Sequence, residues 1–191
     1  MHAMPNAPLA PSRPTLSFLL RHPAHWIALG FGSGLSPKAP GTAGTLWAWV
    51  AWLLLQTIVP HTALGWLVLL GIPLGWWACT VTARNMGIAD PGSIVWDEVV
   101  AFWAVLWFLQ PALALEPFSA QAWIWQAAAF AVFRFFDAVK PPPVRCADQR
   151  FKGFGWRGGW GILFDDLVAA ACSVAVLTLI HASGLHAGWW Q

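Results

Sequence analysis

Long stretches without a charged residue dominate the chain and are separated by short polar connections. No Asp, Glu, Lys or Arg lies between Lys38 and Arg84, and a Pro60-centred turn interrupts this stretch. Together with the later apolar runs, the pattern predicts about five helical segments, over residues 44–58, 62–83, 99–115, 118–133 and 162–182. Several of these are short for a hydrocarbon layer about 30 Å thick, so some are expected to tilt or to dip in without crossing.

The composition also indicates that these segments lie in a lipid bilayer. Of the 191 residues, 58% are hydrophobic and 9% are charged, whereas charged residues make up about 25% of a typical soluble domain. We therefore predict an all-α fold, an integral membrane helical bundle with about five membrane segments. A soluble bundle with buried helices is the alternative. Residues 1–25 are expected to form a disordered leader, residues 26–185 a single membrane domain, and residues 186–191 a C-terminal tail.

Basic residues fall on one side of the membrane if all five segments cross. That side receives the N-terminal region and the connections 84–98 and 134–161, which together contain all ten Lys and Arg residues. The other side has Glu116 as its sole charged side chain. The positive-inside rule makes the basic side cytoplasmic. The net charge of +2 and the lack of a basic run interleaved with aromatic residues argue against a nucleic acid partner.

Seven of the eight carboxylates also lie on the cytoplasmic side, and four of them form two adjacent pairs. They are Asp90, Asp97, Glu98, Asp137, Asp148, Asp165 and Asp166. Each pair is predicted to stand where an apolar helix begins. Carboxylates at a membrane rim are costly unless a partner or a cation neutralises them, so the pattern indicates a Mg²⁺ site. The alternative is that the acids only complement the positive ends of helix dipoles.

Two further segments have the chemistry of anion binding. Residues 30–45 read GFGSGLSPKAPGTAGT, and glycines before a helix let backbone N–H groups approach a phosphate. This segment lacks the GK[ST] of a P-loop, and such loops are more often simple turns. Residues 133–148 place Lys140 and Arg145 around three prolines, where they suit phosphate oxygens or, alternatively, anionic lipid headgroups.

Four segments together resemble the phosphatidylglycerophosphatase A family. They are GFGSGLSPKAPGTAGT (30–45), DPGSIVWDEVVAFW (90–103), FRFFDAVKPPPVRCAD (133–148) and GGWGILFDDLVAA (158–170), in the order of the family. The last segment departs from the usual GGxGIMxDDxxAG at Leu163 and Ala170. The resemblance implies an all-α bundle with a central helix surrounded by others. It also implies a bacterial inner-membrane enzyme that removes the terminal phosphate of phosphatidylglycerophosphate with Mg²⁺.

The resemblance assigns the candidate site as follows. The acids Asp97, Glu98, Asp137, Asp165 and Asp166 are expected to bind Mg²⁺ or to activate water, and the phosphate is expected to meet Gly32, Gly34, Lys38, Gly41, Gly44, Lys140 and Arg145. Which acid is the general base, and whether an Asp instead attacks as a nucleophile, is left open. Association into a homo-oligomer is also left open.

Two other function classes compete with this one. A small membrane ion or solute transporter would explain an acidic cytoplasmic rim, but it should also have an acid near the middle of a segment. A lipid-binding scaffold without catalysis would tolerate the loss of either acidic pair. Other phosphatase chemistries lack their motifs: no histidine lies in a matching segment, and no arginine follows Cys146 at the spacing of a cysteine phosphatase loop.

Overall fold

The computed structural model describes residues 13–186, and these residues form eight α-helices and one 3₁₀-helix with no β-strand. In chain order the elements are α1 (Leu16–Leu19), α2 (Pro23–Ala28), η1 (Gly30–Leu35), α3 (Pro40–Leu55), α4 (His61–Met86), α5 (Trp96–Ala112), α6 (Ala120–Val139), α7 (Val144–Arg150) and α8 (Gly155–His186). The all-α prediction is confirmed.

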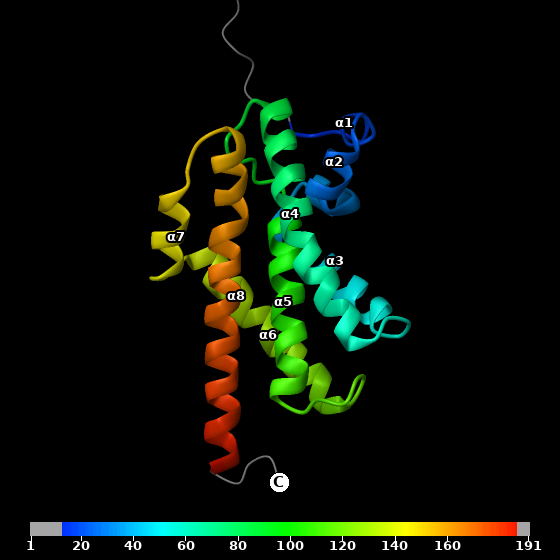
Figure 1. Ribbon diagram of the computed structural model, residues 1–191, viewed down its shortest axis with the longest axis vertical. Helices are drawn as coiled ribbons and strands as arrows, with labels where there is room; N and C mark the ends of the chain where they lie inside the picture. The colour runs from blue at the N-terminus through cyan, green and yellow to red at the C-terminus, as the bar shows by residue number, and fades with distance from the viewer. Residues whose placement is uncertain (1–12, 187–191) are drawn as a thin grey trace, which may run out of the picture.

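Helix α5 is the centre of the bundle. It packs against α3, α4, α6 and α8, and these helices surround it (Figure 1). Its sequence explains the position, because every residue from Val99 to Trp103 is apolar and buried. A helix that is hydrophobic all round must be covered by protein or lipid on every side.

Three helices of the described chain are long and apolar enough to cross a membrane: α4, α6 and α8. Helix α3 has 16 residues and α5 has 17, which gives lengths of about 24–26 Å, short of a hydrocarbon layer about 30 Å thick. The prediction of about five membrane segments is therefore not confirmed. Large apolar side chains on the outer surface, including Leu70 and Leu179, are exposed as lipid-facing residues should be.

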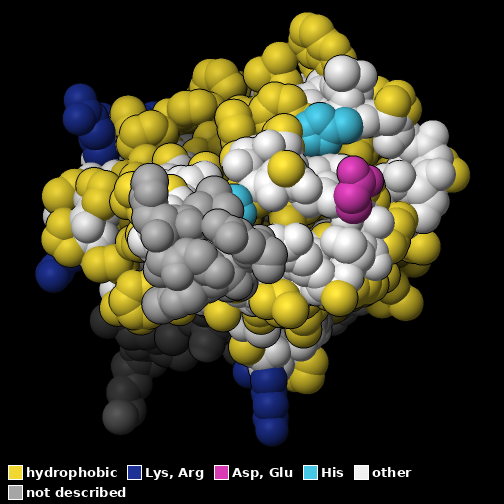
Figure 2. Space-filling model, turned by 90° about the horizontal axis from the view of Figure 1, so that it is seen from below, with side chains coloured by type: hydrophobic (Ala, Val, Ile, Leu, Met, Phe, Trp, Pro, Cys, Tyr) yellow, Lys and Arg dark blue, Asp and Glu magenta, His cyan; other side chains and the backbone are white. Residues whose placement is uncertain are grey.

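The two ends of the bundle differ in character. Helices α4 and α8 pack side by side, and the short helices α1, α2 and α7 gather toward one end (Figure 1). Seen from the opposite end, where α8 finishes, the visible surface mixes hydrophobic side chains with uncharged groups and histidines, has one small acidic area, and shows Lys and Arg only at its margins (Figure 2). Charged side chains are therefore few on the visible part of that end.

The ordered part of the domain begins before the predicted boundary. Helix α1 and the start of α2 lie within residues 13–25, which the sequence analysis assigned to a disordered leader. Side chains cap both helices: the Thr15 hydroxyl accepts from the Phe18 N–H, and His22 Nδ1 accepts from the Ala24 N–H. Residues 1–12 and 187–191 lie outside the described chain.

Candidate active site

Three acids from two helices meet beside the first turn of the central helix α5. Asp97 and Glu98 lie in the first turn of α5, and Asp166 lies within α8, which packs along α5. One carboxylate oxygen from each of the three lies within 4.8 Å of the others. Side chains 68 positions apart in sequence therefore form one cluster, here called the acidic triad.

The second acidic pair does not begin a helix. Helix α8 starts at Gly155, so Asp165 follows ten residues later, about 15 Å along the axis. The prediction that both pairs stand at helix starts is therefore wrong for Asp165 and Asp166. The apolar run predicted a start at residue 162, but Gly158, Gly159 and Gly161 already belong to α8 and let it approach its neighbours. A Cβ on Gly159 would lie 1.9 Å from Thr80 Oγ1 on α4.

The negative charge of the acidic triad is not fully compensated by neighbouring groups. The atoms Asp97 Oδ1, Glu98 Oε2 and Asp166 Oδ2 are buried without a hydrogen-bond partner among the described residues. A buried carboxylate that lacks a partner costs several kcal/mol. The dipole of α5 favours the first pair, but the mid-helix position of Asp166 receives no such help. Carboxylate oxygens in a cluster are the ligands that hard divalent cations take, so the triad fits Mg²⁺.

Arg134 holds one side of the triad. Its guanidinium lies 3.7 Å from Glu98 Oε1, donates to Asp137 one turn further along α6, and donates to the Thr45 hydroxyl of α3 at 3.5 Å. It therefore joins α3, α5 and α6 at the site. Sequence analysis missed this role, although the i,i+3 spacing of Arg134 and Asp137 was a signal for a pair.

Lys140 holds the other side through two carboxylates. Its ammonium donates to Asp148 Oδ1 at 2.7 Å and to Asp165, while Lys152 pairs with the second oxygen of Asp148 at 2.8 Å. Burial, the largest influence on Lys140, disfavours its charge, but the two carboxylates outweigh burial and raise the pKa of Lys140. Burial also acts to raise the pKa of Asp148, but the two lysines lower it overall. Both groups are therefore charged near neutral pH.

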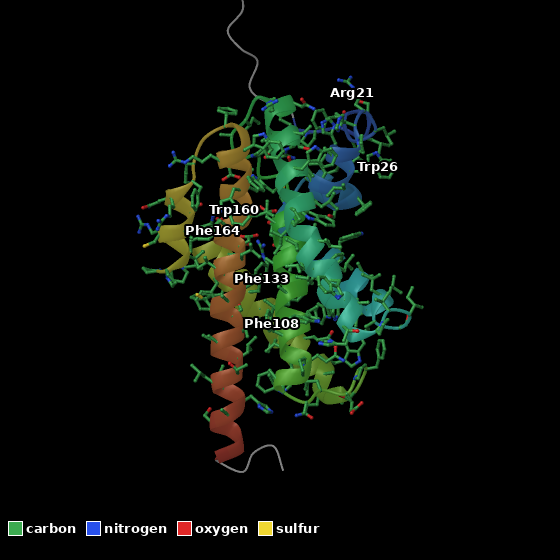
Figure 3. All side chains as sticks on the ribbon, viewed as in Figure 1. Arg21, Trp26, Phe108, Phe133, Trp160 and Phe164 are labelled. Atoms are coloured by element: carbon green, nitrogen blue, oxygen red, sulfur yellow. The ribbon has the colours of Figure 1, made fainter. Side chains whose placement is uncertain are left out.

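These side chains line a cavity of about 200 Å³. Six predicted site residues line it: Asp97, Glu98, Asp137, Lys140, Asp165 and Asp166. Asp90, Asp148, Lys152, Gly158 and Gly161 also line it. Phe151 completes a wall and packs edge-on against Phe164 of α8, labelled in Figure 3, with ring centroids 5.2 Å apart.

The remaining predicted phosphate-binding residues do not line this cavity. Lys38 and Arg145 are exposed. The predicted glycines instead lie where two parts of the backbone or a backbone and a side chain approach closely. A Cβ on Gly34 would lie 2.1 Å from the Ser93 carbonyl oxygen, and one on Gly44 would lie 2.6 Å from Val95 Cβ. Gly32 has a φ of +107°, and Gly41 lies beside Glu98. The glycine-rich segment thus allows η1 and α3 to approach α5 and its preceding loop.

The comparisons with known proteins agree on one family. The family model described as phosphatidylglycerophosphatase A matches residues 26–181. A protein of Escherichia coli K12 named phosphatidylglycerophosphatase A is 41% identical over 161 residues, which cover 84% of this chain and 85% of that protein. The protein of that name from Haemophilus influenzae is 38% identical, covering 89% of this chain and 96% of its own.

A third relative has another name. A protein of Bacteroides thetaiotaomicron that carries the provisional name of a phosphatidylinositol-3-phosphatase is 40% identical, covering 80% of this chain and 90% of its own. No solved structure matches this chain. All three names describe phosphatases of phosphomonoesters, and the family match spans most of the chain. The chain therefore belongs to the phosphatidylglycerophosphatase A family and is a phosphatase that acts on a phosphomonoester.

Proposed function

We propose that this protein hydrolyses the terminal phosphomonoester of phosphatidylglycerophosphate to phosphatidylglycerol and phosphate, using Mg²⁺ at the cytoplasmic face of the bacterial inner membrane. The observation that carries the proposal is the acidic triad beside the cavity, because each of its three carboxylates has one buried oxygen with no hydrogen-bond partner among the described residues. Two named relatives act, by their names, on this lipid phosphate.

The acidic triad of Asp97, Glu98 and Asp166 would hold the metal. When bound, Mg²⁺ neutralises charge on the phosphoryl oxygens and lowers the pKa of water. Arg134 orients the triad from the side of α6 through Glu98 and Asp137. Its positive charge therefore lies beside two acids at the edge of the proposed metal site.

Lys140 is suited to receive the phosphate. An ammonium has three N–H donors, and the carboxylates of Asp148 and Asp165 take two of them. The third donor can meet a phosphoryl oxygen in the cavity that Lys140 lines. Lys152, also on the cavity wall, adds a second positive charge that attracts the dianionic group.

Hydrolysis needs a water oxygen to bond to phosphorus while the ester P–O bond breaks and the departing alkoxide takes a proton. Asp137 and Asp165 line the cavity, and each can accept the proton of that water. Both are held by a cation, Asp137 by Arg134 and Asp165 by Lys140. A fixed orientation is what a general base requires.

The direct test is phosphate release by the full-length protein in detergent micelles or vesicles. We expect turnover of phosphatidylglycerophosphate that EDTA abolishes and Mg²⁺ restores, since the triad offers oxygen ligands alone. Phosphatidylinositol 3-phosphate is the comparison substrate, because one relative carries that name. Full activity after metal removal contradicts the metal assignment. Faster turnover of the inositol lipid contradicts the substrate assignment.

A further inference from the structure

The connection between α7 and α8 combines positive charge with exposed aromatic rings. Residues 150–157 read RFKGFGWR and contain no acid; we call them the basic–aromatic segment. The side chains of Phe154 and Trp156 are 63% and 53% exposed, and Arg150 and Arg157 are exposed as well. The segment arches over the start of α8, at the end of the bundle where α1 and α2 also lie (Figure 1).

Contacts with two helices hold the backbone of this segment in place. A Cβ on Gly158 would lie 1.8 Å from the Gly153 carbonyl oxygen, so the glycine lets the segment lie directly on the first turn of α8. On the other side, Trp76 of α4 donates its indole N–H to the Trp156 carbonyl oxygen at 2.6 Å. The exposed rings of the segment therefore extend from a backbone that is fixed to the bundle.

The segment stands at the end of two helices that can cross a membrane. Helix α8, which begins at Gly155, and α4 are both long and apolar enough to do so. The rings of Trp156 and Trp160 lie against Trp76, with centroids 5.5 and 5.6 Å apart, and Trp160 is labelled in Figure 3. Tryptophan is enriched where a spanning helix meets the membrane surface, and Lys and Arg flank its cytoplasmic end. The segment therefore has the composition of a membrane-surface contact.

The charges of the segment are matched to an anionic surface. Neither of its arginines forms an ion pair with a described residue, whereas its lysine, Lys152, pairs with Asp148. Free cations beside exposed aromatic rings suit anionic lipid headgroups and the apolar layer below them. A second copy of the chain would offer little charge in return, because Asp90 and Glu116 are the only exposed carboxylates in the described chain.

We propose that the basic–aromatic segment contacts anionic phospholipids at the membrane surface and holds the adjoining wall of the catalytic cavity at the level of their headgroups. Phe151, Lys152 and Gly153 belong to the segment and line the cavity. Lipid contact and cavity wall are therefore joined within a few residues. The lipid contact itself does not depend on the proposed function. Its consequence for substrate entry rests on that function, because the proposed substrate is itself an anionic lipid.

The test measures the surroundings of residue 154 in bilayers of defined charge. Phe154→Cys is labelled with acrylodan, whose emission moves to shorter wavelength in less polar surroundings. The full-length protein also carries Cys146→Ser and Cys172→Ser, and the remaining Cys79 is buried. It is placed in nanodiscs of phosphatidylcholine alone or of equal parts phosphatidylcholine and phosphatidylglycerol.

Two double variants separate the charge of the segment from its structure. Arg157 donates from its guanidinium to the Arg150 carbonyl oxygen at 3.2 Å, so its replacement also removes a hydrogen bond. Arg150→Gln with Arg157→Gln removes both charges, whereas Arg150→Lys with Arg157→Lys keeps them and changes the hydrogen bonding. Arg21→Gln with Arg84→Gln is the matched control, because Arg21, labelled in Figure 3, and Arg84 are exposed and lie outside the segment.

We expect emission at shorter wavelength in the discs with phosphatidylglycerol, because anionic headgroups attract the segment into the interface. The Gln pair should lose most of this shift, and the Lys pair and the matched control should keep it. With Phe154 restored and in the same discs, the Gln pair should raise KM for phosphatidylglycerophosphate at least about fivefold and change kcat less than about twofold, because each basic residue near an anionic surface strengthens the contact.

Equal emission in the two kinds of disc, or an equal loss of the shift in the matched control, would overturn the proposal. An unchanged KM in the Gln pair would overturn its consequence for substrate entry. A shift in a wild-type segment whose protein releases no phosphate would establish the lipid contact and reject the proposed function. Phosphate release without a shift would do the reverse.

Discussion

Individual carboxylates in this protein are held in two different ways. Asp148 and Asp165 are matched by lysines, and Asp137 by Arg134. Within the described part of the chain, Asp97 and Asp166 each have one buried oxygen with no hydrogen-bond partner. Burial of an unmatched carboxylate opposes folding, so its presence indicates a function at that position that requires negative charge.

Removal of one charge from the acidic triad should therefore abolish catalysis and spare the fold. We expect Asp97→Asn and Asp166→Asn to lower kcat by at least about 10²-fold, the scale of one main electrostatic contribution in an active site. Without metal, their thermal unfolding midpoints should equal or exceed that of the wild type, because like charges repel. Phosphate release and thermal unfolding measure the two effects.

Glu116→Gln is the matched control for this pair of variants. Glu116 is exposed between α5 and α6, outside the cavity, so its loss should leave activity within about twofold. Similar losses in all three variants would show that the acids act through insertion or folding. Turnover near that of the wild type in both Asn variants would remove these residues from the site.

At the scale of elements, the face of α3 that meets α5 is built from glycines with different neighbours. A Cβ on Gly41 would lie 2.1 Å from Glu98 Oε1, the far end of a flexible side chain. A Cβ on Gly44 would instead meet the branched Val95 at 2.6 Å. The small size of Gly41 leaves room for the Glu98 carboxylate of the acidic triad. The small size of Gly44 allows α3 to pack against Val95.

Alanine at these two positions should separate the two effects. Gly41→Ala should displace the Glu98 carboxylate and raise the Mg²⁺ concentration needed for half-maximal activity at least about tenfold, with little loss of stability. Gly44→Ala should destabilise the protein by about 1–3 kcal/mol, the usual cost of overpacking a core. Metal titrations of activity and thermal unfolding distinguish them. The opposite pattern would show that Glu98 is not a ligand.

A histidine joins three helices near the start of the domain. His25 is buried on α2. Its Nδ1 forms a hydrogen bond of 2.8 Å with the carbonyl oxygen of Phe18 in α1, and its Nε2 forms one of 2.9 Å with the side-chain amide of Asn85 in α4. Burial, opposed by the Phe18 hydrogen bond and assisted by the charges of His22 and Arg21, lowers the pKa of His25 from 6.5. The folded state therefore favours the neutral ring.

This shift sets the sign of a pH effect. Because the pKa is lower in the folded state, the stabilisation is present above pH 6.5 and is lost as the pH falls below that value. We expect the thermal midpoint to fall between pH 7.5 and 5.5, by about 2–4 °C for each kcal/mol lost. His25→Gln keeps a donor and an acceptor but cannot titrate, so its midpoint should vary less over this range. An unchanged slope in the variant would assign the effect to other groups.

At the scale of the molecule, the bundle separates a highly charged end from a weakly charged one. The acids and their lysines lie around one cavity, and the view from the other end shows few charged side chains (Figure 2). Positive residues stay on the cytoplasmic side of a membrane protein. The proposed function therefore includes a cavity on the cytoplasmic side, with the end of α8 on the opposite side.

Labelling of a natural cysteine can test this orientation. Cys146 on α7 is exposed, whereas Cys79 is buried. A membrane-impermeant maleimide should leave Cys146 unmodified in intact cells and modify it after permeabilisation, and Cys146→Ser should remove that signal. A reporter fused after Gln191 should be active in the periplasm. Modification of Cys146 in intact cells would reverse the orientation.

The sequence by itself determined the helical class, the distribution of charge and the family. These properties are carried by composition and by short motifs, because a bilayer selects apolar segments through local hydrophobicity and every backbone group in it must be paired within the segment. Five acids that the sequence predicted for the site, together with Lys140, line one cavity in the structure.

Only the tertiary structure decided which of these residues meet. Asp165 and Asp166 are adjacent in sequence but point about 100° apart on a helix, so Asp166 joins Asp97 and Glu98 while Asp165 turns to Lys140. The rotation of α8 relative to α5 and α7 fixes that choice, and it depends on packing across the bundle. For the same reason Arg134 entered the site and Lys38, Arg145 and the glycines did not line it. Sequence spacing records the distance along one helix, whereas a site forms from the faces that several helices turn toward each other.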